Sequence, residues 1–301
     1  MSLVKPLIVR LPNHLGDACM ALPALEMLAD RGLALTLVGR AWAKDLFSAH
    51  PWTIVSFATS RIQALRAIGV NQGLLLTNSF GSALEFRLAG ISSTGYARDG
   101  RSWLLDKAVA VDASKHMVEY YYELATAFAG SPSDVPRDFR LRIGEPAQLR
   151  ADNLLSTHEV HAPYIVLCPV AIGFHRGRKK AWDGFTRLNG ELLTAGKQVV
   201  AMPGPNETEA VRNALPGAIV LPESEVSTFA AVLAGSCLVI ANDSGAGHLA
   251  AAAGARLISV FGVTEPEKTR PWSTRATLIG SGKGWPPYNE VRSAVDAALA
   301  G

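Results

Sequence analysis

The sequence has few cysteines, no strong excess of either charge and no long apolar run. Its three cysteines, Cys19, Cys168 and Cys237, lie far apart. An odd number at these spacings gives neither a disulfide framework nor a metal-ligand pattern, which is typical of a reducing compartment. The formal net charge of +3 is too small to indicate nucleic-acid binding, although a local basic face could serve an anionic substrate.

Signatures of membrane insertion, export and dinucleotide binding are also missing. No apolar run reaches the length that a bilayer requires, and Met1–Pro6 lacks the pattern of a secretory signal because the first expected strand follows at once. That strand is not followed by Gly-x-Gly-x-x-Gly, which argues against a dehydrogenase. The chain has 301 residues, of which 49% are hydrophobic, and this is enough for two domains of ordinary size.

Short apolar runs alternate with segments of helical spacing along the whole chain. The main expected strands are Leu7–Leu11, Leu35–Val38, Gly73–Thr77, Tyr164–Cys168, Gln198–Met202, Ala218–Leu221, Leu238–Ala241 and Leu257–Phe261. This alternation predicts an α/β protein with two doubly wound domains facing a central cleft, with ligands at the carboxyl ends of the strands. We place the domains at residues 1–150 and 151–285, and a helix within residues 286–301 that returns across the first domain.

The most informative motif is the turn Asn242-Asp243-Ser244-Gly245-Ala246-Gly247-His248. An apolar strand precedes it and an alanine-rich helix follows. Backbone N–H groups at a helix start carry partial positive charge, and glycines allow close approach of a ligand. The turn therefore predicts the phosphate cradle of a nucleotide-dependent enzyme. The alternative is an ordinary strand-to-helix turn in which Asp243 or Ser244 is the N-cap.

Other turns that follow expected strands also carry chemically useful side chains. Asp17 could accept a proton from a sugar hydroxyl, or it could be a helix N-cap. The four cations within His175–Trp182 could neutralise a diphosphate leaving group, or they could form a solvated surface. Glu207 could bond ribose hydroxyls and Thr264 a phosphate or sugar hydroxyl; the alternatives are a helix-start acid and a bare turn.

Taken together and in this order, the motifs resemble glycosyltransferase family 9, the bacterial lipopolysaccharide heptosyltransferases. The resemblance extends from about residue 7 to residue 272, and it is carried by Leu15-Gly16-Asp17 with Leu22–Leu25, Thr77–Ala83, Lys180-Ala181-Trp182, Asn242–Ala252 and Phe261–Pro266. It implies a GT-B fold of two Rossmann-like domains with the active site between them. The first domain would bind the acceptor and the second the nucleotide sugar.

The resemblance also implies an activity and a set of site residues. The activity is inverting, metal-independent transfer of heptose from ADP-heptose to a Kdo or heptose residue on a lipid A precursor, with no cofactor. Asp17 matches the general base. The implied donor-binding residues are Lys180, Asp243, Ser244, Gly245, His248, Glu207 and Thr264, and the implied acceptor-binding residues are Asn13, Gly16, Asn78 and Ser79.

The acceptor's position in the inner leaflet implies a cytoplasmic enzyme that is peripheral on the inner membrane. Arg98, Arg101 and Lys107 could face anionic lipid, or they could belong to an ordinary solvated loop.

Several positions depart from the family pattern. Ala246 and Gly247 replace a bulkier pair, Glu265 stands where Asp is more frequent, and Asp183 stands where Pro is common. Two alternatives to heptose transfer therefore stay open. One is a related glycosyltransferase that uses another nucleotide sugar for a different surface glycan. The other is a catalytically silent nucleotide-binding scaffold, against which the intact set of Asp17, Lys180, Asp243 and His248 argues.

Overall fold

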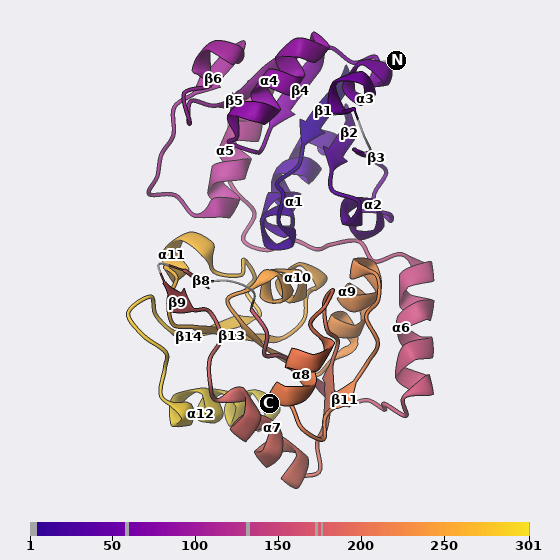
Figure 1. Cartoon of the computed structure of the whole chain (residues 1–301), viewed down its shortest axis with the longest axis vertical. Helices are drawn as coiled ribbons and strands as arrows, with labels where there is room; N and C mark the ends of the chain where they lie inside the picture. The colour runs from indigo at the N-terminus through magenta and orange to yellow at the C-terminus, as the bar shows by residue number, and fades with distance from the viewer. Residues whose placement is uncertain (1–4, 58–59, 131–132, 172–173, 176, 301) are drawn as a thin grey trace. The chain divides into compact units, whose positions relative to one another are not determined.

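The computed structural model describes residues 5–57, 60–130, 133–171, 174–175 and 177–300. The chain divides into two compact units, residues 1–136 and 137–301. Each unit is built on a parallel six-stranded sheet flanked by helices, which confirms the predicted α/β class (Figure 1).

The sheet of the first unit has the strand order β3-β2-β1-β4-β5-β6. Its strands are β1 (Lys5–Arg10), β2 (Leu33–Gly39), β3 (Thr53–Ser56), β4 (Gln72–Leu75), β5 (Ser92–Tyr96) and β6 (Lys107–Val109). Its helices are α1 (Leu15–Asp30), α2 (Trp42–Leu46), α3 (Arg61–Ile68), α4 (Phe80–Ala89) and α5 (Met117–Ala129), with a 3-10 turn at Ser102–Leu104. The strand order reverses between β1 and β4, and ligands of doubly wound sheets bind at such a switch point.

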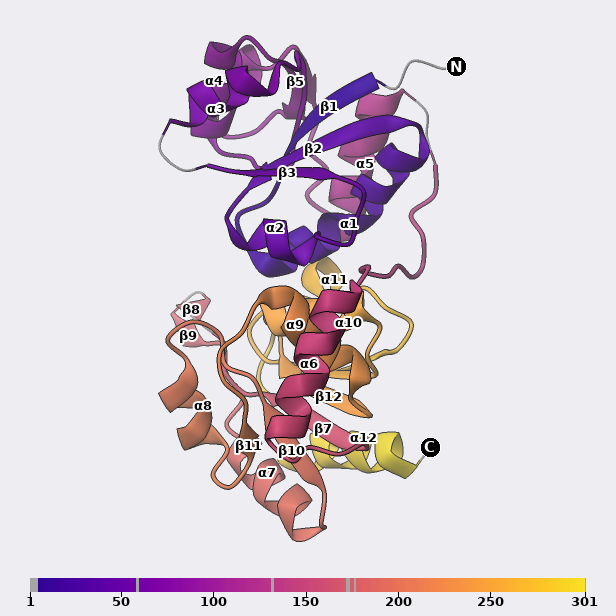
Figure 2. The same ribbon diagram turned by 90° about the vertical axis from the view of Figure 1, so that its right-hand side faces the viewer.

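Helices lie on both faces of this sheet. On one face α3 and α4 pack together, and Leu65 and Phe86 join Ile8 and Leu75 in one apolar cluster. Helices α1 and α5 pack along each other, as Figure 2 shows (Figure 2). Most of α1 is buried, since its sequence is apolar on several sides. The residues at its start are therefore held on a fixed element.

The second unit repeats the same order, with β11-β10-β7-β12-β13-β14. Its strands are β7 (Tyr164–Cys168), β10 (Gln198–Ala201), β11 (Ile219–Val220), β12 (Leu238–Asn242), β13 (Leu257–Phe261) and β14 (Ala276–Gly280), and a small hairpin pairs β8 (Phe174–His175) with β9 (Arg178–Lys179). Its helices are α6 (Glu145–Thr157), α7 (Phe185–Thr194), α8 (Thr208–Ala214), α9 (Val226–Gly235), α10 (Gly245–Ala253), α11 (Pro266–Thr269) and α12 (Tyr288–Ala300). Here the switch point lies between β7 and β12.

The structure differs from the sequence-based domain limits at two helices. The predicted limit between residues 150 and 151 falls inside α6, which packs on α9 of the second unit. Helix α12 was expected to return across the first domain. Instead it contacts β13 and β14, and Val291 and Val295 lie in the core of the second unit. These two valines are four residues apart and therefore lie on one side of the helix. This apolar side packs against the sheet.

The close packing of α4 on β4 gives a stability prediction. A Cβ added at Gly73 would lie 2.7 Å from the Phe86 ring and 2.8 Å from Ile91 Cγ2, so we expect Gly73→Ala to lower the free energy of unfolding by about 1–3 kcal/mol. The matched control is Gly81→Ala on α4, where the added Cβ meets open space; it should be neutral or stabilising by about 0.5–1 kcal/mol. Denaturant unfolding followed by circular dichroism measures both. Equal stability of the two variants would contradict this packing.

Candidate functional site

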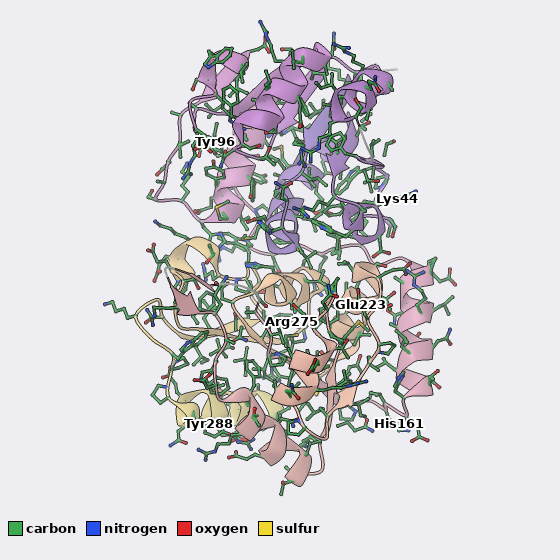
Figure 3. All side chains as sticks on the ribbon, in the orientation of Figure 1. Lys44, Tyr96, His161, Glu223, Arg275 and Tyr288 are labelled. Atoms are coloured by element: carbon green, nitrogen blue, oxygen red, sulfur yellow. The ribbon has the colours of Figure 1, made fainter. Side chains whose placement is uncertain are left out.

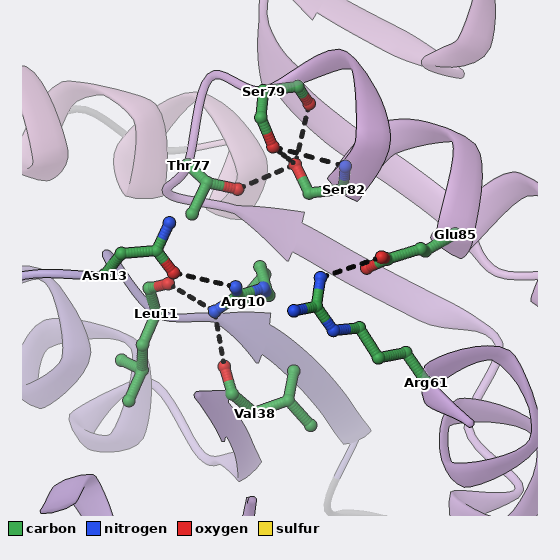
Figure 4. Close-up of polar contacts among 9 residues, drawn as sticks. All are labelled: Arg10, Leu11, Asn13, Val38, Arg61, Thr77, Ser79, Ser82 and Glu85. Atoms are coloured by element: carbon green, nitrogen blue, oxygen red, sulfur yellow. Dashed lines mark hydrogen bonds and ion pairs between the residues drawn. The ribbon is translucent and has the colours of Figure 1, made fainter. Parts of the chain in front are cut away.

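In the first unit, the turns that follow β1 and β4 are adjacent, because Arg10 pairs with Leu75 at the carboxyl ends of these strands. Arg10 is 5% exposed, and burial lowers the pKa of its guanidinium. Its Nη1 donates to the carbonyl oxygen of Leu11 at 2.8 Å, and its Nη2 donates to Asn13 Oδ1 at 2.9 Å (Figure 4). A guanidinium only donates, so the amide oxygen of Asn13 faces Arg10 and its NH2 group is left as a donor.

Hydroxyl groups order the turn after β4. Ser79 is the N-cap of α4, and its Oγ accepts from the backbone N–H of Ser82 at 3.2 Å (Figure 4). Thr77 donates its hydroxyl to Ser82 Oγ at 2.8 Å, and Ser82 Oγ donates to the Ser79 carbonyl at 2.8 Å. The predicted acceptor residues Asn78 and Ser79 therefore lie on a turn with a fixed backbone.

The side chain of Arg101 also forms hydrogen bonds with the turn that follows β4. Its side chain is 0% exposed, and it donates to the carbonyl oxygens of Tyr96, Thr77 and Ser79 and to Asn78 Oδ1. The sequence placed Arg101 in a solvated loop or against lipid; both interpretations are wrong for this residue. Burial lowers the pKa of its guanidinium, and its hydrogen bonds to carbonyl oxygens compensate for the desolvation.

Asn78 has a second partner, and it comes from α5. Tyr120 donates its hydroxyl to Asn78 Oδ1 at 3.0 Å, and the Tyr120 ring stacks on Tyr96 with 4.0 Å between ring centroids. Figure 3 labels Tyr96 within the first unit. The amide oxygen of Asn78 thus accepts from both Arg101 and Tyr120, so its NH2 group is the part left for a ligand. Asn13 and Asn78 both present donors at the switch point.

Asp17 lies in the first turn of α1, at its third residue. The N-cap position belongs to His14, so Asp17 is not the cap that the alternative interpretation expected. Its carboxylate is partly buried, and its charge, together with burial as the larger cause, raises the pKa of the Tyr121 phenol on α5 well above the usual value. Burial, with the charge of Asp17, raises the pKa of the nearby Cys19 thiol to about 12. Gly16 is buried directly before Asp17.

In the second unit, Asn242 connects the turns that follow β7 and β12. Its side chain is 0% exposed, its Nδ2 donates to the Pro169 carbonyl at 2.8 Å, and its Oδ1 accepts from the Trp182 N–H at 2.9 Å. The indole N–H of Trp182 donates to the Pro286 carbonyl, and its ring stacks on Tyr288. Lys180, which is half-buried, sits two residues before this anchored tryptophan.

The other cations of this turn differ in their placement. Arg178 donates to the carbonyl oxygen of Gly262 at 3.1 Å, which joins the turn to the end of β13. Lys179 belongs to the small strand β9, and Arg176 lies outside the described residues. The structure therefore uses Arg178 to join two turns, which the alternative of a purely solvated cluster does not account for.

Asp243, Thr264 and His248 come together at the carboxyl edge of the second sheet. The Thr264 hydroxyl donates to Asp243 Oδ2 at 2.5 Å, and His248 Nε2 lies 3.9 Å from Asp243 Oδ1. All three side chains are less than 10% exposed. The hydroxyl proton that was expected to reach a phosphate or a sugar is thus directed at Asp243, and Thr264 orients this carboxylate.

The start of α10 has the features of an anion site. Ser244 occupies the N-cap position, yet no side-chain cap bond forms, and Asp243 is bonded to Thr264 instead. Within the part of the chain that the structure describes, the buried Oγ of Ser244 has no hydrogen-bond partner. The first N–H groups of a helix also lack partners within the helix, so at Gly245 both kinds of donor are available to a ligand.

Glu207 closes the turn after β10. Its Oε2 accepts from the N–H of Gly204 at 3.0 Å, from the N-cap position of α8. Its charge adds to the effect of burial, which raises the pKa of Cys168 at the end of β7 to about 12. The carboxylate thus orders its own turn, as the helix-start alternative expected, and contact with a ribose stays a prediction.

The part of the chain that the structure describes offers neither a candidate metal centre nor a candidate membrane span. It contains no group of three or more His, Cys, Asp or Glu residues that could hold a metal ion. Within these same residues, no helix has the length and apolar character needed to cross a membrane.

The comparison with known sequences gives one family. The model of glycosyltransferase family 9 (heptosyltransferase) matches residues 58–295. The chain is 26% identical to lipopolysaccharide heptosyltransferase 2 of Escherichia coli K12 over 321 residues, which cover 95% of this chain and 90% of that protein. It is 28% identical to lipooligosaccharide heptosyltransferase 2 of Haemophilus influenzae over 229 residues, which cover 69% and 65%.

Solved structures share the fold. ADP-heptose lipopolysaccharide heptosyltransferase II of E. coli superposes with a TM-score of 0.81 at 24% identity, over 98% of each chain. A family 9 glycosyltransferase from Veillonella parvula gives 0.85 at 17% identity, over 98% of this chain and 97% of that one. The E. coli heptosyltransferase WaaC with ADP gives 0.76 at 20% identity, over 98% and 100%. These likenesses confirm the predicted GT-B fold.

The role of Asn242 can be tested apart from any ligand. Asn242→Ala leaves the Trp182 N–H and the Pro169 carbonyl without their partner, and each unsatisfied buried group costs about 1–3 kcal/mol. We expect lower stability and faster hydrogen exchange at the Trp182 amide, measured by mass spectrometry. The control is Asn189→Ala, which removes an equally buried asparagine bonded to the Pro216 carbonyl. It should lower stability without changing exchange at residues 180–182; equal exchange in both variants would contradict the anchoring role.

Proposed function

The chain belongs to glycosyltransferase family 9, and we propose that it is an inverting transferase that moves heptose from ADP-heptose to the inner core of lipopolysaccharide. The observation that carries this proposal is the carboxylate of Asp243, oriented by Thr264 beside the start of α10. The family match and the relatives named lipopolysaccharide heptosyltransferase support the same activity. WaaC, which shares the fold, has been solved with ADP and with ADP-2-deoxy-2-fluoro heptose.

The second unit supplies the donor half of this proposal. The start of α10 and the Ser244 hydroxyl offer hydrogen-bond donors to the diphosphate, and Lys180 offers a positive charge. Because Thr264 occupies Asp243 Oδ2, the other carboxylate oxygen is the one that can accept hydrogen bonds from the sugar hydroxyls. Fixed donors and a cation relieve the charge that develops as the diphosphate leaves, so the protein needs no metal for this step.

The first unit supplies the acceptor half. We assign Asp17 as the general base, and the NH2 groups of Asn13 and Asn78 as donors to the acceptor saccharide. An acceptor hydroxyl oxygen forms the new bond to the anomeric carbon while the bond from that carbon to the diphosphate breaks. Asp17 takes the hydroxyl proton in the same step. Attack opposite to the leaving group inverts the anomeric centre. This mechanism requires both units to contact one pair of substrates during transfer.

We further propose that the acceptor is lipid-linked and that the enzyme works at the cytoplasmic surface of the inner membrane. The support is the chemistry of the reaction named for the relatives, since lipopolysaccharide is anchored in a bilayer by its lipid. Binding of the protein to vesicles that contain an acceptor lipid, compared with vesicles that lack it, would test this location.

One observation supports a second candidate for the nucleotide-sugar donor. A Cβ at Gly247 would lie 3.3 Å from the Asn242 carbonyl, so the first turn of α10 has a small residue beside a backbone group. This position and Ala246 depart from the family pattern, and a different sugar could fit here. A thermal-shift comparison of ADP-heptose with UDP- and GDP-sugars separates the two donors. Absence of turnover with every donor would favour the scaffold alternative instead.

The assignment of Asp17 predicts a loss of catalysis without a loss of donor binding. Asp17→Asn preserves shape but removes the basic carboxylate, so we expect kcat to fall by about 10²–10⁴-fold. The affinity for ADP, measured by calorimetry, should not change, because α10 and Lys180 lie in the other unit. Asp30→Asn at the exposed end of the same helix is the charge-matched control and should retain wild-type kcat. A fully active Asp17→Asn enzyme would remove Asp17 from catalysis.

The assignment of Lys180 to the donor site predicts that its loss weakens the binding of ADP. Lys180→Ala removes a charge-assisted contact to the diphosphate, which is worth about 1.5–3 kcal/mol, so the Kd for ADP should rise by roughly 10–100-fold. Calorimetry with ADP measures this directly. Lys197→Ala changes an exposed lysine of the same unit by the same amount of charge and should leave the Kd unchanged. An unchanged Kd for Lys180→Ala would place the diphosphate elsewhere.

A further inference from the structure

The connection between β14 and α12 contacts the turn that carries Thr264. A Cβ added at Gly262 would overlap the indole of Trp285, so this ring lies directly on the glycine. A Cβ added at Gly282 would lie 2.8 Å from the carbonyl oxygen of Thr264. Because the Thr264 hydroxyl orients the carboxylate of Asp243, the connection packs against a turn on which the proposed donor site depends.

The same connection and the first residue of α12 contact Trp182, which follows Lys180 by two residues. The indole N–H of Trp182 donates to the Pro286 carbonyl at 3.3 Å, and its ring stacks on Tyr288 with 5.9 Å between ring centroids and 10° between ring planes. Figure 3 labels Tyr288 at the start of α12. The Trp182 side chain is 6% exposed. Its position is therefore set by Pro286 and Tyr288, in addition to the hydrogen bond from its backbone N–H to Asn242.

The Tyr288 ring is itself held by a side chain of α7. The guanidinium carbon of Arg187 lies 3.9 Å from the centroid of this ring, which is a cation–π contact. Arg187 Nε is also paired with Glu191 Oε1 at 2.9 Å, one turn further along the same helix. Helix α7 thus keeps the guanidinium over the ring on which Trp182 stacks.

Lys180 lies between two anchored residues. On its amino-terminal side, Arg178 donates to the carbonyl oxygen of Gly262 at 3.1 Å. On its carboxyl-terminal side, Trp182 is anchored through its backbone N–H and its indole. Gly262 is also the residue on which Trp285 lies, so both anchors lead to the connection between β14 and α12. Loss of an anchor would free the backbone of Lys180 without removing its charge.

We propose that Tyr288 is a positioning residue of the donor site, whose ring fixes Trp182 and thereby places the ammonium group of Lys180 for the donor diphosphate. The proposal rests on the assignment of Lys180 to the donor site. A cation on a mobile segment must be ordered when the diphosphate binds, and this ordering lowers the affinity. A segment that is fixed before binding avoids this loss. Tyr288 does not contact the nucleotide sugar in this proposal; it acts through the backbone of residues 180–182.

The first test compares two substitutions of Tyr288 in the full-length enzyme. Tyr288→Leu removes the aromatic ring, so we expect the Kd for ADP, measured by calorimetry, to rise about threefold to tenfold, which is the loss of one well-made aromatic contact. Tyr288→Phe keeps the ring and should bind ADP as the wild type does. Val295→Ala in the buried side of the same helix is the control for stability, and it should lower stability without raising the Kd. Wild-type affinity in Tyr288→Leu would overturn the proposal.

A double-mutant cycle separates positioning from a general loosening of the second unit. If Tyr288 acts through Lys180, Tyr288→Leu should change the Kd for ADP by less than about twofold in the Lys180→Ala background. An equal rise in both backgrounds would overturn the role of Tyr288 and leave the assignment of Lys180 intact. An unchanged Kd for Lys180→Ala alone would remove Lys180 from the donor site, and the role of Tyr288 would fail with it.

The contact can also be weakened from the surface, which keeps the proposal testable if Tyr288→Leu does not fold. Arg187→Gln removes the cation over the ring, and this side chain is 64% exposed. We expect the Kd for ADP to rise about twofold to fivefold, and the rise to vanish in the Lys180→Ala background. Arg212→Gln removes the same charge from an exposed position of α8 and should leave the Kd unchanged. Equal Kd values for Arg187→Gln and Arg212→Gln would overturn the proposal.

Discussion

In each sheet, one buried polar side chain at the carboxyl edge bonds several of the turns that carry the site. The geometry of the site depends on these hydrogen bonds. Asn242 joins the turn of Trp182 to the end of β7, and Arg101 joins the turn of Asn78 to β5. Backbone groups of such turns are shielded from water and need partners. A single side chain that satisfies several of them gives the turns a rigidity close to that of the strands, and a binding site needs this rigidity.

The buried charged groups of the two sites differ in their partners. Arg10 and Arg101 donate to carbonyl and amide oxygens, and these bonds compensate for the water that burial removes. Asp243 accepts a close hydrogen bond from the hydroxyl of Thr264, which orients the carboxylate without adding a second charge. The arginines therefore fix the backbone of the turns, and the threonine fixes the carboxylate that is proposed to hold the sugar hydroxyls.

Strands were the part of the fold that the sequence predicted best. The predicted limits of β7 and β13 coincide with the observed ones, because a fully buried parallel strand is a continuous apolar run. The first residues of the helices were harder to predict from the sequence. Helix α1 begins at Leu15, so Asp17 lies inside the helix and not on the preceding turn or at the N-cap, where the sequence placed it. The limit between the units was missed because α6 has few apolar residues, and only its packing on α9 shows where it belongs.

Residues that face a ligand could be found from sequence, since polar side chains directly after strands gather at one edge of a parallel sheet. The residues behind them could not, because their partners lie far along the chain and only tertiary packing brings them close. Tyr120 bonds Asn78, which lies 42 residues earlier in the chain, because α5 packs against β5. Arg98 and Arg101 are the same residue type three positions apart, yet the first side chain is 55% exposed and the second is completely buried. Burial, and not residue type, decides which arginine organises the turn.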